Sequence, residues 1–164
     1  MGNMVRTLLA GIGLLLGLVT PAWPAAAVDV TFDNPAGFTD VGNRRLPADG
    51  VRDAYLADLR KHLIGQAAKV LPPSQALQVV VTDVDMAGMF FMRDDVRIVR
   101  DVTPPRIALR FTLRDAEGRT IRDGERLLTD PMFLWGVSLH SSDPLRHERR
   151  LLDQWVQREF RQAD

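Results

Sequence analysis

The most regular pattern in the chain is an alternation of apolar and polar residues over 107–114, where isoleucine, leucine and phenylalanine occupy every second position. Such an alternation is typical of a strand with one buried and one solvated face. The next four residues, Asp115–Gly118, favour a type I turn whose glycine adopts the left-handed conformation. We therefore predict a hairpin in which residues 119–129 form the returning strand.

The register of this hairpin follows from its short connection. Arg114 is expected to pair with Thr120, and Leu113 with Ile121. The returning strand is mostly polar and contains Gly124, which favours a sheet edge or a bulge.

Three further segments have strand patterns. Residues 28–33 alternate and end at Asn34. Residues 77–84 contain three consecutive valines, which favours a central strand covered on both faces. Residues 96–102 have a weaker pattern of the same kind.

Two segments have apolar residues spaced by three or four, the period of an amphipathic helix. The first begins at Val51 and ends at Pro72. In the second, Asp143 is a suitable N-cap and Pro144 suits the first helical position. Its apolar stripe consists of Leu145, Leu152, Trp155, Val156 and Phe160. The order of elements predicts a two-layer α+β fold, with a mixed four- to five-stranded sheet and two long helices on one face.

The amino-terminal residues 1–27 have the features of a cleavable signal peptide. The apolar run Leu8–Val19 is too short to span a bilayer, which needs about 20 residues. Small residues at 25–27 precede Val28, as a signal peptidase requires. We expect residues 28–164 to form one domain that is periplasmic or secreted and has no membrane anchor after cleavage. An uncleaved amino-terminal anchor is the alternative.

The amino-acid composition excludes several kinds of catalysis and ligand. The chain has no cysteine, which excludes thiol catalysis, disulfides and a lipoprotein anchor. Its 21 acidic residues balance its 21 basic residues, so there is no electrostatic case for nucleic acid or for an anionic lipid surface. No phosphate-binding loop or dinucleotide fingerprint occurs, and we expect no cofactor.

Several short motifs are peculiar to one group of proteins. They are Val30-Thr31-Phe32, Asn34-Pro35, Phe38-Thr39-Asp40, Leu46-Pro47, Asp83-Val84-Asp85-Met86-Ala87-Gly88, Pro105-Arg106-Ile107 and Ser141-Ser142-Asp143-Pro144-Leu145. In these motifs the chain resembles the bacterial exported family labelled domain of unknown function 3016. The resemblance covers residues 28–164 and implies an envelope location, with no catalytic residues to transfer.

Two loops are unexpectedly apolar. The first contains a cluster that could bind another envelope protein or an apolar ligand, made of Met89, Phe90, Phe91 and Met92. The second spans Met132–Leu139. Either loop could instead fold back and complete the core.

Four carboxylates form the alternative candidate site. In the predicted register, Asp123 and Glu125 share the face of Phe111, unless a bulge at Gly124 turns them to solvent. Asp83, Asp85, Gly88 and Asp94 have the spacing of positions 1, 3, 6 and 12 of a calcium loop. Ala87 at position 5 and an aspartate in place of glutamate at position 12 depart from the pattern, and we expect no metal.

The segment His140–Asp143 contains the residue types of a hydrolase triad. Their adjacency argues against one, because a triad needs side chains that converge from separate segments. Two functions therefore remain: a non-catalytic binding or adaptor domain of the cell envelope, or a small enzyme or metal-binding domain that uses Asp83, Asp85, Asp123 and Glu125.

The signal peptide leads to a direct prediction. Protein purified after export by its native host should begin at Val28, because residues 25–27 form the cleavage site. Amino-terminal sequencing checks this. Recovery of Met1, or of an intact Leu8–Val19 run, would contradict it.

Overall fold

A computed structural model describes residues 27–42, 48–90, 97–135 and 141–161 of the chain. Its main sheet has four strands in the order β1-β2-β5-β6. The strands are β1 (Val28–Phe32), β2 (Ala76–Asp85), β5 (Arg106–Arg114) and β6 (Thr120–Thr129). β1 is parallel to β2, and the other neighbours are antiparallel, so the sheet is mixed.

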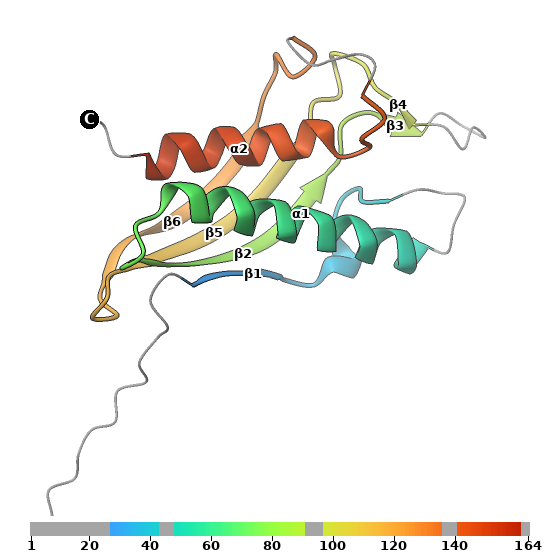
Figure 1. Cartoon of the computed structure of the whole chain (residues 1–164). Helices are drawn as coiled ribbons and strands as arrows, with labels where there is room; N and C mark the ends of the chain where they lie inside the picture. The colour runs from blue at the N-terminus through green and yellow to red at the C-terminus, as the bar shows by residue number, and fades with distance from the viewer. Residues whose placement is uncertain (1–26, 43–47, 91–96, 136–140, 162–164) are drawn as a thin grey trace, which may run out of the picture.

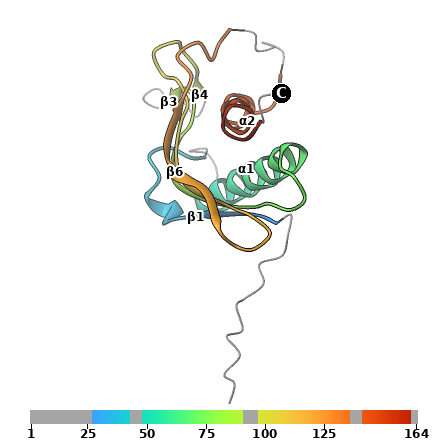
Figure 2. The same ribbon diagram turned by 90° about the vertical axis from the view of Figure 1, so that its left-hand side faces the viewer.

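Two helices, α1 (Ala48–Val70) and α2 (Arg146–Phe160), pack on the same face of this sheet (Figures 1 and 2). His62 of α1 and Asp153 of α2 join the helices through a 2.7 Å contact between Nε2 and Oδ1. The predicted α+β class, with both helices on one face, is confirmed. Among the described residues, no helix is long and apolar enough to cross a membrane.

One hydrophobic core lies between the helices and the sheet. The alternating residues of β5 supply Ile107, Leu109, Phe111 and Leu113. At its centre Phe111, Trp155 and Phe160 pack edge to face, with ring centroids 5.3–5.6 Å apart. The three-valine run of β2 is covered on one face only, because Val80 lies on the helix-free face and is half-buried.

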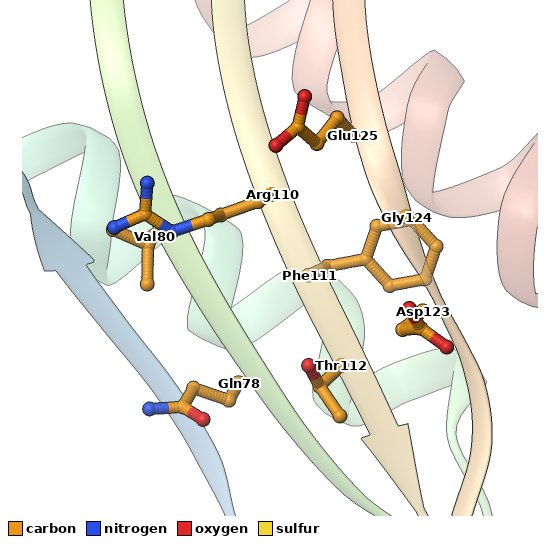
Figure 3. A pocket seen from close by; sticks show the side chains of 8 residues that line it. All are labelled: Gln78, Val80, Arg110, Phe111, Thr112, Asp123, Gly124 and Glu125. Atoms are coloured by element: carbon orange, nitrogen blue, oxygen red, sulfur yellow. The ribbon is translucent and has the colours of Figure 1, made fainter.

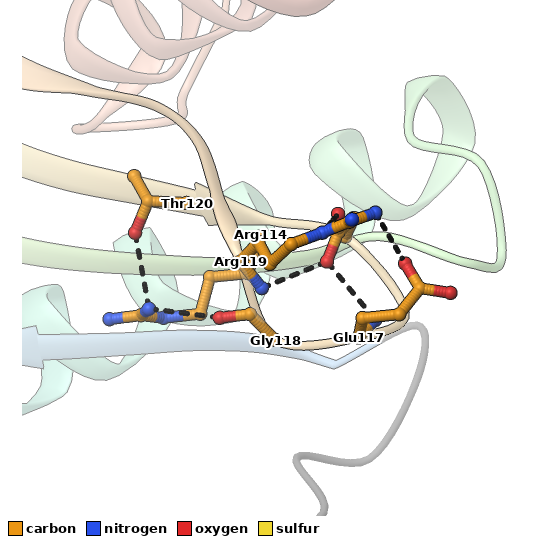
Figure 4. A network of polar contacts seen from close by, with 6 residues as sticks. Arg114, Glu117, Gly118, Arg119 and Thr120 are labelled. Atoms are coloured by element: carbon orange, nitrogen blue, oxygen red, sulfur yellow. Dashed lines mark hydrogen bonds and ion pairs between the residues drawn. The ribbon is translucent and has the colours of Figure 1, made fainter.

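The hairpin turn forms as its sequence predicts. Gly118 has φ +78°, in the left-handed region. The carboxylate of Asp115 accepts hydrogen bonds from the amides of Glu117 and Arg119, and it pairs with the guanidinium of Arg119 (Figure 4). The pairing of Arg114 with Thr120 is confirmed.

The rest of the predicted register is wrong by one residue. Leu113 pairs with Arg122, so Ile121 is an extra residue in β6 and is about half exposed. A one-residue shift moves every later side chain of a strand to the opposite face. The bulge is therefore at Ile121, and Gly124 continues the ladder opposite Phe111.

Two other elements differ from the sequence pattern. The strand predicted over 96–102 is reduced to β4 (Arg97–Ile98), which pairs with β3 (Met89–Phe90) outside the main sheet. Helix α2 begins at Arg146, two residues after Pro144, because Asp143 caps a preceding turn: its Oδ1 accepts the amide of Leu145 at 2.9 Å. A short 3₁₀ helix, η1 (Pro35–Gly37), follows β1.

Candidate functional site

The carboxylates of Asp123 and Glu125 lie on the helix-free face of β6. The bulge at Ile121 reverses their predicted orientation, so they are exposed and do not share the face of Phe111. The sequence also allowed a bulge at Gly124 that would turn both carboxylates to solvent. Their exposure is as that alternative predicted, but the bulge is at Ile121.

These two residues line a shallow hollow of about 410 Å³ (Figure 3). Its other side chains include those of Gln78, Arg110 and Thr112. Neither Asp83 nor Asp85 lines it. The sheet register explains the separation, since Asp83 and Asp85 are on β2, two strands away and nearer its other end. The four carboxylates of the sequence-based site are not brought into one pocket.

Asp83 and Asp85 instead lie near the end of β2, where the backbone of Asp85 forms a bridge to Asp40. Both carboxylate oxygens of Asp83 accept hydrogen bonds from Thr39, one from the amide and one from the hydroxyl, at 2.7 Å each. Burial raises the pKa of Asp85, and the nearby Asp40 adds to this effect. Asp94, the last position of the calcium-like spacing, lies outside the described residues. Within the described ranges, no three potential metal-ligating side chains gather.

The triad-like segment has a local role as well. His140 lies outside the described residues. The hydroxyl of Ser141 accepts the amide of Asp143 at 3.3 Å, and Oδ2 of Asp143 binds the guanidinium of Arg149 at 3.0 Å. These contacts fix the turn before α2.

The apolar loops divide between surface and core. Met89 is 49% exposed, and Phe90 is half-buried. In the second loop Phe133 is 1% exposed and belongs to the interior, whereas Met132 and Trp135 are exposed. Phe91, Met92, Val137 and Leu139 lie outside the described residues.

The centre of this region is the side chain of Arg97 in β4. Its guanidinium binds both carboxylate oxygens of Asp40, at 2.9 Å each. It also donates to the carbonyls of Met86, Gly88 and Gly42, at 3.2–3.4 Å. Its carbon lies 4.6 Å from the ring centroid of Phe90, in a cation–π contact.

Gly88 permits this arrangement. Its φ of +84° is unfavourable for residues with a side chain, and a Cβ there would lie 2.6 Å from the carbonyl oxygen of Ile98. Glycine at position 88 therefore lets the turn after β2 lie closer to β4 than a residue with a side chain would allow.

The carboxylate of Glu148, in the first turn of α2, is buried beneath this turn. Glu148 is 1% exposed. Its Oε1 accepts the amide of Ala87 at 2.7 Å, whereas Oε2 is buried without a hydrogen-bond partner among the described residues. Burial raises the pKa of Glu148; the bond from Ala87 and the charge of Arg97 oppose the increase.

The neighbouring His147 is 4% exposed, and both of its ring nitrogens are buried without a hydrogen bond of normal geometry to any described residue. Its ring packs edge to face on Phe133, with centroids 4.9 Å apart. Burial lowers the pKa of His147, as does the charge of Arg146, and the backbone of Phe133 opposes the decrease.

His147 lines a cavity of about 250 Å³ between the amino-terminal ends of both helices and the β3–β4 hairpin. The elements that surround it meet at one end of the sheet (Figure 1). The lining residues are Gly42, Tyr55, Met86, Ala87, Phe90, Val99, Pro144, Arg97, Arg146 and His147. This cavity, with an apolar wall and a basic wall, is the candidate site.

Sequence reasoning missed most of this site. One signal was available for Glu148, because it lies three residues after Leu145 and four before Leu152, inside the apolar stripe of the helix. A carboxylate on a buried stripe indicates a specific partner. Arg97 gave no such signal, since its partners are distant in sequence.

A family model described as "Protein of unknown function (DUF3016)" matches residues 26–158. The chain belongs to this family. The resemblance found in the sequence motifs is thereby confirmed. Several of those motifs meet at the candidate site of this DUF3016 protein: Asp40, the segment Asp85–Gly88 and Pro144 surround Arg97 or the cavity.

The comparisons with curated proteins and with solved structures are less informative than the family match. No curated protein matches the chain. Among solved structures, the chain is similar to a dodecamer of a PelC variant from Paraburkholderia phytofirmans, at 12% identity and a TM-score of 0.33, covering 85% of this chain and 90% of that one.

The burial of Glu148 leads to a prediction about pH. Because its pKa is raised by folding, its contribution to stability is full below the ordinary value of 4.5 and is lost as pH rises through the folded-state pKa. Glu148→Gln keeps an oxygen for Ala87 and removes the charge. We expect the melting temperature of Glu148→Gln, relative to wild type, to increase between pH 5 and pH 8.

Glu159→Gln is the matched control on the same helix. Glu159 forms an ion pair with Arg126 at 3.0 Å, so loss of its charge should lower the melting temperature at pH 8. A difference between Glu148→Gln and wild type that does not change with pH would contradict the prediction.

Proposed function

We propose that this DUF3016 protein acts outside the cytoplasm as a non-catalytic binding domain, which recognises another component of the cell envelope through the surface around Met89 and Phe90. The single observation that carries the proposal is the position of these residues. Met89 is exposed, and Phe90 forms part of the wall of the candidate cavity. An exposed methionine beside an aromatic ring is a surface that can adapt to a partner.

Contacts within the protein itself fix the backbone of this surface. Arg97 joins the hairpin to Asp40 and to the carbonyls after β2, and Gly88 is packed against Ile98. A surface ordered in advance loses less conformational entropy on binding. This rigidity supports a recognition role for the hairpin.

The alternative function, a small enzyme or metal-binding domain, has less support. It requires Asp83, Asp85, Asp123 and Glu125 to act together, but Asp123 and Glu125 line a hollow that neither Asp83 nor Asp85 reaches, and the carboxylate of Asp83 is bound by Thr39. Groups that carry out one acid–base reaction must reach the same substrate atoms.

Thermal stability distinguishes a binding surface from core. Phe90→Ser should lower the melting temperature by less than about 10 °C, because the ring is only half-buried. Phe133→Ser should lower it by more, since truncation of a buried aromatic costs about 3–5 kcal/mol and each 1 kcal/mol moves a small domain by several degrees. Equal losses for the two variants would show that Phe90 is core.

Binding is tested by photo-crosslinking in the native host. A photoreactive phenylalanine analogue at Met89 should give a discrete adduct with another envelope component, and Phe90→Ser should remove it. The same analogue at Ile121, which is similarly exposed but lies near the hairpin turn at the opposite end of the sheet, is the control. No adduct at Met89, or the same adduct from Ile121, would overturn the proposed function.

A further inference from the structure

The segment Asp130–Trp135 follows β6 and packs on α2 through one buried side chain. Phe133 is the only buried residue of this segment, at 1% exposure, whereas Met132 and Trp135 are exposed. The ring of Phe133 packs edge to face on the imidazole of His147, with ring centroids 4.9 Å apart. The segment is therefore attached where an aromatic ring meets a titratable one.

Two polar contacts also join this segment to α2. Nε2 of Gln154 donates to Oδ2 of Asp130 at 3.3 Å, and the guanidinium of Arg150 donates to the carbonyl of Trp135. Hydrogen bonds near the surface contribute modestly to stability, whereas burial of an aromatic side chain contributes several times more. The packing of Phe133 on His147 is thus the main attachment of the segment.

The imidazole of His147 suits this position only while it is neutral. It is 4% exposed, and its ring nitrogens have no accessible surface. A protonated imidazole has two N–H donors, and each needs an acceptor. The backbone of Phe133 favours the protonated form, but neither nitrogen has a hydrogen bond of normal geometry among the described residues. Protonation in place would leave a buried charge and an unpaired donor, which is costly.

The cationic and neutral groups around the ring do not offset this cost. Arg146 and Arg150, on the same helix, both disfavour a further positive charge at His147. Arg97 of β4 and the phenol of Tyr55 in α1 line the same cavity as His147. None of these four groups is an anion that could pair with a protonated imidazole.

The carboxylates of the elements packed around the ring are bound elsewhere. They accept the amides of Ala87, Met132 and Leu145, and they belong to Glu148, Asp130 and Asp143, respectively. None of these three carboxylates raises the pKa of His147. Acid therefore places an uncompensated charge at the point where Phe133 is held.

We propose that protonation of His147 releases the segment Asp130–Trp135 from α2, so that acid exposes Phe133 together with Met132 and Trp135. The ring takes up one proton from solvent and leaves its buried position, and Phe133 loses the surface on which it packs. The result is an apolar surface that is available mainly in acid. This inference concerns the folded chain itself and does not depend on the partner proposed for Met89 and Phe90.

The size of the effect follows from the linkage between opening and protonation. Burial lowers the pKa of His147 in the folded state, and the ring regains its ordinary value of 6.5 when the segment opens. The contact is therefore fully stable above pH 6.5 and weakens as pH falls towards the folded-state pKa. With one proton taken up, the opening equilibrium increases by at most about thirtyfold between pH 7.5 and pH 5.

The neighbouring Glu148 makes unfolding of the whole domain respond differently to acid. Burial raises the pKa of Glu148, so protonation of this residue stabilises the folded state. Global unfolding releases both residues, and their two effects oppose each other. Release of the segment alone leaves Glu148 bound to Ala87, so only the effect of His147 remains.

Native-state hydrogen exchange of the exported protein at pH 7.5 and pH 5 measures the opening. The amides of Phe133 and Trp135 donate to carbonyls within the segment, at 3.1 and 2.8 Å. Their protection factors, which are corrected for the intrinsic effect of pH, should fall by about fivefold to thirtyfold at pH 5. Val79 in the sheet should change less, and it should be better protected than Phe133 at both pH values.

Two matched variants assign the effect to one histidine. His147→Gln keeps an N–H donor beside Phe133 but cannot be protonated in this range, so protection of Phe133 should change by less than about twofold. His62→Gln removes the other described histidine, which contacts Asp153 at 2.7 Å across the two helices. This control should show the same pH dependence at Phe133 as the wild type.

Three results would overturn the inference. They are equal protection of Phe133 at both pH values in the wild type, an equal loss in His147→Gln, and an equal loss at Val79, which would indicate unfolding of the whole domain. If His147→Gln does not fold, an NMR titration of the wild-type imidazoles decides. A midpoint for His147 at or above 6.5 would show that the ring accepts a proton in place and would contradict release.

Discussion

At the end of the sheet where β2 leads to the β3–β4 hairpin, the structure depends on the guanidinium of Arg97. This group contacts the segment after β1, the turn after β2 and the β3–β4 hairpin at the same time. Arginine suits this position because its planar donors can bind a carboxylate at two points and reach carbonyls as well. These contacts fix the wall of the cavity and keep Phe90 beside it. The surface that we propose for binding follows from this one side chain.

Glu148 completes the same arrangement from the helix side. Its bond to the amide of Ala87 holds the turn after β2 against the start of α2, although this buries a carboxylate. A single buried acid of this kind favours one position of the helix over its neighbours, because a slip would leave both the amide and the carboxylate unpaired. His147 is placed on the cavity wall as a consequence.

The sequence pattern predicted the elements better than their details. Alternation over 107–114 and the apolar stripe that includes Leu152 and Trp155 predicted β5 and α2, because both signals arise from local periodicity. The register of β6 could not be predicted in the same way. One extra residue, Ile121, reverses the faces of Asp123 and Glu125, and nothing in the residue types marks a bulge there.

The site was less predictable than the fold. The apolar cluster that contains Met89 and Phe90 indicated the surface that we propose for binding, since such residues are unusual in a loop. The groups that build the cavity come from distant segments: Arg97 is 57 residues from Asp40, and Glu148 is 61 residues from Ala87. No spacing rule connects such pairs before the chain is folded, and only Glu148 gave a signal, as a charge within an apolar stripe.

Native-state hydrogen exchange tests most directly whether Arg97 holds this end of the molecule. In the wild-type protein, the amides of Ala87 and Gly88, which donate to Glu148 and to the Thr103 carbonyl, should be protected nearly as well as those of Val79 and Val81 in the sheet. In Arg97→Gln, Ala87 and Gly88 should lose most of this protection while Val79 and Val81 keep theirs. Rapid exchange of Ala87 and Gly88 in the wild type, or protection that does not change in Arg97→Gln, would contradict a central role for Arg97.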